Sequence, residues 1–153
     1  MTSTAIFHPT DLSPASAVAF RHALRLSLGG SLGIVHVHGI GKPAAGWADY
    51  PHVRETLARW NLAGMTPAVR KIEAAGRDVG AVLAGALQRN PADLIVLACH
   101  PRSGVAAWLK PSVSQALVRQ TRLPALFVPE GIVGFVDENG AVDLPTVMVA
   151  VAA

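Results

Sequence analysis

Residues 93–98 read DLIVLA, and this continuous apolar run decides the fold. A short run that is apolar on both faces is typical of a strand buried in a parallel sheet. Residues 32–37 (LGIVHV) have the same character, and residues 4–8 and 124–128 predict two more strands. Residues 68–74 (AVRKIEA) alternate weakly and carry charges, which is typical of a strand at the edge of a sheet.

Helical patterns separate these strands. Ser13 followed by Pro14 predicts a helix start, with serine as N-cap and proline at the first helical position. Further helices are predicted at residues 51–60, at 78–89 with Asp78 as cap, and from Pro111 or Ser112 to residue 120. Strands that alternate with helices indicate an α/β fold. We expect an open five-stranded parallel sheet with helices on both faces, of the Rossmann-like kind.

The composition narrows the class of protein. The chain has 153 residues, of which 51% are hydrophobic and 15% charged, enough for one domain with one core. Cys99 is the only cysteine, so no disulfide can form within the chain. We find no signal peptide and no apolar run of the ~20 residues that span a membrane, so we expect a cytoplasmic protein. The net charge is +3 and the basic residues are scattered, which does not favour nucleic acid.

The last part of the chain follows a different pattern. We assign residues 1–130 to one domain and residues 131–153 to an extension. Residues 135–143 predict a hairpin around Asn139-Gly140. Residues 146–151 (TVMVAV) predict a strand with no helix after it. Such a strand needs a partner, which is the sheet itself, a second copy in a homodimer, or a following tandem domain.

In open parallel sheets, ligands bind beyond the carboxyl ends of the strands, at the point where the strand order reverses. Residues 8–11, 37–41, 99–104 and 129–130 follow the predicted strands and are therefore the segments in which to seek a ligand site.

Several of these segments resemble the universal stress proteins of the UspA type. The blocks are residues 9–13 (PTDLS), 35–37 (VHV), 92–97 (ADLIVL) running into His100, and 123–129 (LPALFVP). The resemblance covers most of the chain and implies a strand order of 3-2-1-4-5. It also implies a role in stress response, with a small nucleotide-type molecule bound near strands one and four.

The phosphate loop departs from the pattern of this family. Many members bind ATP through glycine, two residues, glycine, nine residues, glycine, and then serine or threonine. The corresponding residues here are Ala98, Pro101, Pro111 and Ser112. Proline lacks an N–H and cannot adopt the left-handed turn that glycine permits, so we expect weak ATP binding or none. Ser112 and the helix start still offer hydrogen-bond donors to an anion.

The resemblance places the base and ribose contacts at Thr10, Asp11 and Val37. A structural role is the alternative for two residues, because Asp11 also fits the turn and Ser112 also fits a helix cap. The full set of candidate nucleotide-binding residues is Pro9, Thr10, Asp11, Val37, Ala98, His100, Pro101, Arg102, Lys110, Pro111, Ser112 and Val113.

Three other functions stay open at this point. His8, His38 and His100 follow three neighbouring strands and would suit Zn²⁺ if they converged, although no close ligand pair supports this and we expect no metal. A slow ATPase rests on fold analogy alone, and we assign no catalytic residue. An interaction module would fill its pocket with Trp47 or Trp108 and use the tail as an interface. Cys99 fits a small buried residue better than a nucleophile.

Overall fold

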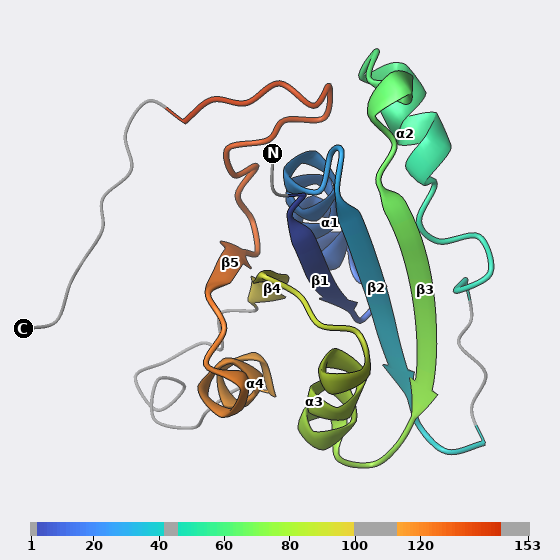
Figure 1. The fold of residues 1–153 in the computed structure, drawn as a ribbon, viewed down its shortest axis with the longest axis vertical. Coiled ribbons are helices and arrows are strands. Elements are labelled where there is room, and N and C mark those ends of the chain that lie inside the picture. The colour runs from blue at the N-terminus through green and yellow to red at the C-terminus, as the bar shows by residue number, and fades with distance from the viewer. Residues whose placement is uncertain (1–2, 42–45, 100–112, 145–153) are drawn as a thin grey trace, which may run out of the picture.

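A computed structural model describes residues 3–41, 46–99 and 113–144. Five parallel strands form one sheet with the order β3-β2-β1-β4-β5 (Figure 1). This is the order that the family resemblance implies. The strands are β1 (Ala5–Thr10), β2 (Ser31–His38), β3 (Ala68–Ala75), β4 (Leu94–Cys99) and β5 (Ala125–Pro129).

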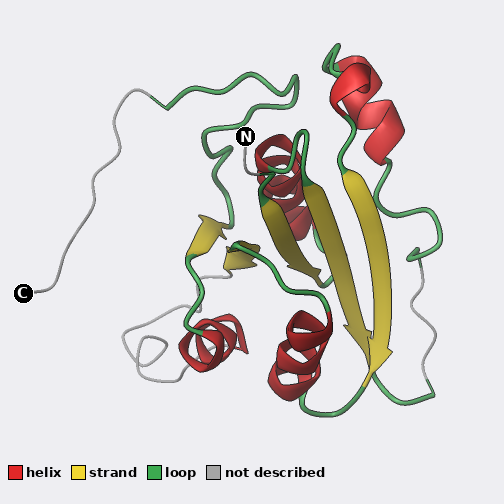
Figure 2. Ribbon diagram, viewed as in Figure 1, coloured by secondary structure: helices red, strands yellow, loops and turns green. Residues whose placement is uncertain are grey.

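Helices cover both faces of the sheet, as Figure 2 shows in red. One face carries α1 (Pro14–Leu26) and α2 (Val53–Arg59), which is followed by a short 3₁₀ turn, η1 (Ala63–Met65). The other face carries α3 (Val79–Arg89) and α4 (Val113–Thr121). The predicted α/β class, with helices on both faces, is therefore confirmed.

Two apolar clusters form the core, one on each face. On the α1 face, Ile6 and Ile34 of the sheet pack with Leu24. On the α3 face, Phe7 and Val35 pack with residues of α3 and α4. The alternation of Ile6 and Phe7 between the two clusters shows that β1 is buried on both sides, which is why both of these neighbouring residues are apolar.

The two predicted helix caps are present. The Ser13 hydroxyl accepts a hydrogen bond from the Ser16 amide at 3.2 Å, and Pro14 is the first residue of α1. The Asp78 carboxylate accepts from the Ala81 amide at 3.0 Å. Such caps satisfy backbone donors that a helix leaves without partners.

Some boundaries differ from the prediction. The first strand continues through Pro9 to Thr10, because the residue before a proline is held in extended geometry and Pro9 itself tolerates it. The second helix begins only at Val53. Residues 68–75 form an edge strand that is largely exposed, as their charges predicted.

The predicted hairpin is present in a short form. Val136 and Val142 lie opposite each other in an antiparallel bridge. The Asp137 carboxylate accepts from the amides of Asn139 and Ala141, and Gly140 has φ +76°. The left-handed backbone of Gly140, and the hydrogen bonds of Asp137 to amides within its own turn, explain why the chain turns at residues 137–140. The predicted strand at 146–151 lies outside the described residues.

Candidate functional site

The strand order reverses at β1, which lies between β2 and β4. Thr10 ends β1 and is paired in register with His36 of β2. β1 and β4 are also parallel, so their carboxyl ends open at the same edge of the sheet. The residues that follow β1 therefore occupy the position at which open α/β sheets bind ligands.

Asp11 is held firmly in the turn after β1. Its Oδ1 accepts from the Ser16 hydroxyl at 2.6 Å and from the Ser13 amide at 2.9 Å. The next residue, Leu12, has φ +64°, so the chain reverses sharply into α1. The structural role considered for Asp11 is thus present, and these bonds also fix its carboxylate at the edge where a ligand would meet it.

His36 fastens the ends of β1 and β2 together. Its Nδ1 lies 2.9 Å from the Thr10 carbonyl oxygen, which can only accept, so Nδ1 donates this hydrogen bond. Trp47 packs against its ring, with 5.5 Å between the ring centroids. The Lys71 ammonium on β3 lies 4.7 Å from the Trp47 ring centroid and donates to the carbonyl oxygens of Trp47 and Ala48. These contacts hold the loop after β2 against the face of the sheet that α1 covers.

Trp47 is therefore a structural residue of this loop. Only 8% of it is exposed, and both an imidazole and an ammonium lie against its ring. An indole in this setting has little surface left for stacking on a base. Trp47 lies beside His36, whose ring hydrogen-bonds to Thr10 at the end of β1. Trp60, the other described tryptophan, is buried in the core. Trp108 lies outside the described residues.

A buried polar group lies beneath the site, between the sheet and α1. His8 is fully buried, and its Nδ1 donates to the Val96 carbonyl oxygen at 2.8 Å. Burial lowers the pKa of His8 to about 4, so the ring is neutral at neutral pH. Phe20 packs between the rings of His8 and Tyr50. Burial also raises the pKa of Tyr50 to about 12, so this phenol stays protonated.

The other candidate residues within the described ranges have apolar side chains, apart from the Cys99 thiol. The side chain of Val37 packs against the core of the α3 face, and Ala98 packs against that of the α1 face. Val113 begins α4 and is 46% exposed. Cys99 is half-buried, and burial raises the pKa of its thiol, which disfavours the reactive thiolate. The remaining predicted residues, His100, Pro101, Arg102, Lys110, Pro111 and Ser112, lie outside the described residues.

The structure separates two of the three predicted zinc ligands. His8 pairs in register with Ile34, and His38 lies four residues further along β2, about 13 Å away at ~3.3 Å per residue. His8 turns toward β4, whereas His38 lies 3.3 Å from Glu73 on β3. These two side chains do not converge, because His8 hydrogen-bonds to β4 on one side of β1 and β2, whereas His38 contacts Glu73 of β3 on the other side. Among residues 3–41, 46–99 and 113–144, no three metal-ligating side chains gather.

Two residues that shape this region were not predicted from the sequence. Tyr50 is the only tyrosine and directly precedes a proline, which could have marked it as a fixed point of the loop. Lys71 had no local signal, because its partners lie 24 and 23 residues earlier in the chain.

The comparisons with known proteins agree with this geometry. A family model described as the universal stress protein family matches residues 4–129. No curated protein matches the chain. A universal stress protein solved in complex with cAMP is 24% identical, covers 83% of this chain and 98% of its own, and superimposes with a TM-score of 0.60.

Two further structures are similar. UspA from Lactobacillus plantarum is 18% identical over 84% of this chain and 99% of its own, with a TM-score of 0.56. A universal stress protein from Archaeoglobus fulgidus is 18% identical over 81% of this chain, with a TM-score of 0.61. The match spans only 43% of that longer relative.

The sheet order and the edge at which it reverses define a doubly wound α/β domain whose candidate small-molecule site lies after β1. Because the family model covers most of its length, the chain belongs to the universal stress protein family. No helix within the described ranges is long and apolar enough to cross a membrane.

Proposed function

We propose that this chain acts in stress response by binding an adenine nucleotide at the carboxyl edge of β1 and β4, and that it binds ATP weakly or not at all. The observation that carries this proposal is the turn at Thr10 and Asp11. It lies at the point where the strand order reverses, and two hydrogen bonds hold its carboxylate in place. A fixed carboxylate at such an edge is suited to accept from ribose hydroxyls.

The relatives support the same class of ligand. One of the similar structures is a universal stress protein in complex with cAMP. At 24% identity this likeness shows the fold, so the ligand of that protein is a guide to which nucleotides to test here.

The sequence of the phosphate loop argues against a tightly held triphosphate. Three glycines of the family pattern are replaced by Ala98, Pro101 and Pro111. Each proline removes one backbone N–H, so fewer donors are left for phosphate oxygens. A nucleotide with a single phosphate loses less from this change than ATP does. We therefore propose that AMP and cyclic AMP bind more tightly than ATP.

Calorimetry with AMP, cyclic AMP and ATP, with and without Mg²⁺, tests this function. Asp11→Asn keeps an oxygen to accept from the Ser13 amide but removes the negative charge. We expect it to weaken AMP binding about tenfold or more, as loss of a charged hydrogen bond does. Asp143→Asn is the matched control, because Asp143 is an exposed aspartate of the tail.

Binding of ATP at least as tight as binding of AMP would contradict the account of the phosphate loop. AMP binding that Asp11→Asn leaves intact would contradict the site assignment. No binding of any of the three nucleotides would overturn the proposed function, and would favour the interaction module instead.

A further inference from the structure

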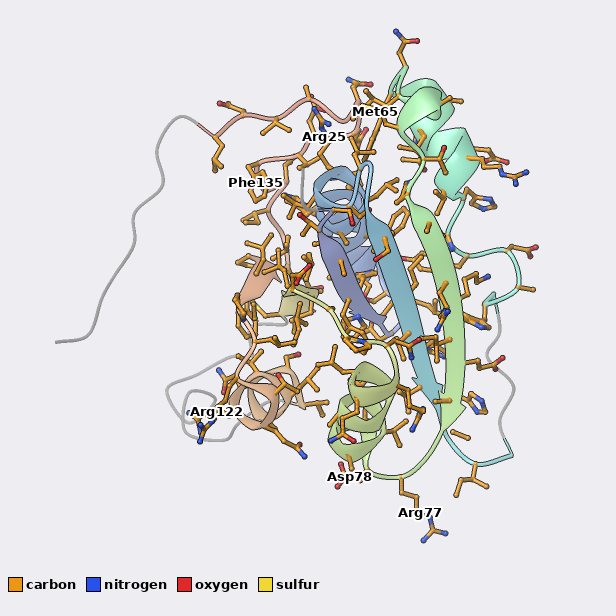
Figure 3. The ribbon with its side chains drawn as sticks, in the orientation of Figure 1. Arg25, Met65, Arg77, Asp78, Arg122 and Phe135 are labelled. Atoms are coloured by element: carbon orange, nitrogen blue, oxygen red, sulfur yellow. The ribbon has the colours of Figure 1, made fainter. Side chains whose placement is uncertain are left out.

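The segment after β5, residues 131–144, runs back along α1 toward the amino edge of the sheet (Figure 1). We call it the strap. It carries Phe135 and the fully buried Val136, and Figure 3 shows Phe135 on the strap and Arg25 on α1 at that end of the molecule. The strap therefore lies away from the carboxyl edge, and its docking against α1 is independent of the proposed nucleotide site.

Three side chains from the helical layer hold the strap through its backbone. The Trp60 indole donates to the Glu138 carbonyl oxygen at 2.9 Å. The Arg25 Nε donates to the Gly140 carbonyl oxygen at 3.1 Å. The third is His22 of α1, which is fully buried and meets the strap at Phe135 and Val136.

The hydrogen bonds of His22 fix its protonation state. Its Nδ1 lies 2.9 Å from the Val18 carbonyl oxygen, which can only accept, so Nδ1 carries the proton. Its Nε2 accepts from the backbone amides of Phe135 at 3.0 Å and Val136 at 3.2 Å. Both ring nitrogens are thus used, and the ring must be neutral for the strap to dock.

The packing around His22 leaves its ring no room to adjust. The Phe135 ring meets the imidazole edge-on, with 4.6 Å between the centroids. Gly134 lies directly against Nε2 and Cε1, with φ +76°, so any side chain at this position would collide with the ring. A proton added to Nε2 would point at two N–H groups that are themselves donors.

We infer that His22 is a proton-operated latch, which holds the strap against α1 when neutral and releases it when protonated. Release would break the two hydrogen bonds that Nε2 accepts from the backbone amides of Phe135 and Val136. It would also expose Trp60 and the apolar surface against which Val136 packs. The result is a pH-dependent apolar surface between α1 and α2.

Burial, and then the charges nearby, set the direction in which the pKa of His22 is shifted. Burial lowers the pKa of His22, and the positive charge of Arg21 lowers it further. Arg25, held at Gly140, adds positive charge on the same helix. The Asp137 carboxylate has the opposite sign, but it is turned into its own hairpin. The titratable or charged groups on α1 and on the elements packed against it are His8 of β1, Arg21 and Arg25 of α1, Cys99 at the end of β4, Glu130 after β5, and Asp137, Glu138 and Asp143 of the strap.

Proton linkage gives the direction in which docking of the strap changes with pH. The released state binds a proton near the ordinary histidine pKa of about 6.5, and the docked state binds one only at lower pH. Docking is therefore complete above about pH 6.5 and weakens as the pH falls. In this window the released fraction grows by up to about tenfold for each pH unit.

Amide hydrogen exchange measured by NMR between about pH 7.5 and about pH 5 tests the latch. We expect the protection factors of the Phe135 and Val136 amides to fall by up to about tenfold per pH unit below about pH 6.5. His22→Gln keeps a neutral oxygen acceptor that cannot titrate, and should flatten this slope. His22→Phe has no acceptor and should leave both amides poorly protected at every pH.

Two controls separate the latch from general acid sensitivity. His52→Gln changes an exposed histidine at the start of α2 and should leave the slope as it is. His8→Phe removes the buried histidine of β1 and should also leave the slope at the strap unchanged. Flat protection in the unmodified protein, or a slope that survives His22→Gln, would overturn the inference. So would a slope that disappears in His8→Phe instead, because it would report global unfolding.

Discussion

The hydroxyl of Ser16 donates a 2.6 Å hydrogen bond to the carboxylate of Asp11, and this contact ties the first turn of α1 to the end of β1. Ser16 is buried, although it follows the helix cap by only three residues. The Asp11 carboxylate, at the carboxyl edge of the sheet, is therefore positioned by a side chain from the helix that covers the sheet.

Ser16→Ala should destabilise the fold by about 2 kcal/mol, because it removes a charged hydrogen bond at a partly buried site. It should also weaken AMP binding, since Asp11 loses the contact that orients it. Denaturant unfolding and calorimetry measure the two effects. Ser3→Ala, at an exposed position, is the control. A stable Ser16→Ala variant with unchanged affinity would show that Asp11 needs no such support.

Trp47→Ala should cost about 3 kcal/mol of unfolding free energy, because it removes a buried indole and leaves a cavity beside His36. Lys71→Met keeps the aliphatic stem but removes the charge that meets the Trp47 ring and two carbonyl oxygens. It should cost less than Trp47→Ala but share its effect on the loop. Chemical denaturation of both variants measures this. An unchanged stability of Trp47→Ala would mean that the loop after β2 is not pinned as the structure shows.

The fold should lose stability in mild acid through His8. Its pKa is about 4 in the folded protein and about 6.5 when unfolded, so the unfolded chain binds more protons between these values. Stability is then complete above about pH 6.5 and falls as the pH drops toward 4. The total loss from this group is about 3 kcal/mol.

Urea unfolding at several pH values, in the unmodified protein and in His8→Phe, measures this contribution. The variant keeps an apolar ring beside Phe20 and should show a shallower fall in stability. An equally steep fall in His8→Phe would assign the acid sensitivity to other groups.

Much of the fold could be predicted because its signals are local. Continuous apolar runs marked the buried strands, charges marked β3 as an edge, and Ser13 and Asp78 marked two helix starts. Asn139-Gly140 marked the turn of the hairpin. These patterns depend on neighbours a few residues apart, so a single sequence contains them.

The contacts that shape the site and the strap could not be predicted in this way. His22 meets amides 113 and 114 residues later, and Trp60 donates to a carbonyl 78 residues later. His8 and His38 looked equivalent as histidines at strand ends, but His8 hydrogen-bonds to Val96 of β4 and His38 contacts Glu73 of β3. Side-chain direction within a sheet depends on which strands are adjacent, and local sequence leaves that open.

An NMR titration of isotope-labelled protein with AMP tests the central claim most directly. If the nucleotide binds at the carboxyl edge, the amides of Thr10, Asp11, Val37 and Ala98 will shift most, and those of Ala5 and Ser31 at the opposite ends of their strands will stay in place. Shifts confined to the amino edge, or none at millimolar AMP, would contradict a nucleotide site after β1.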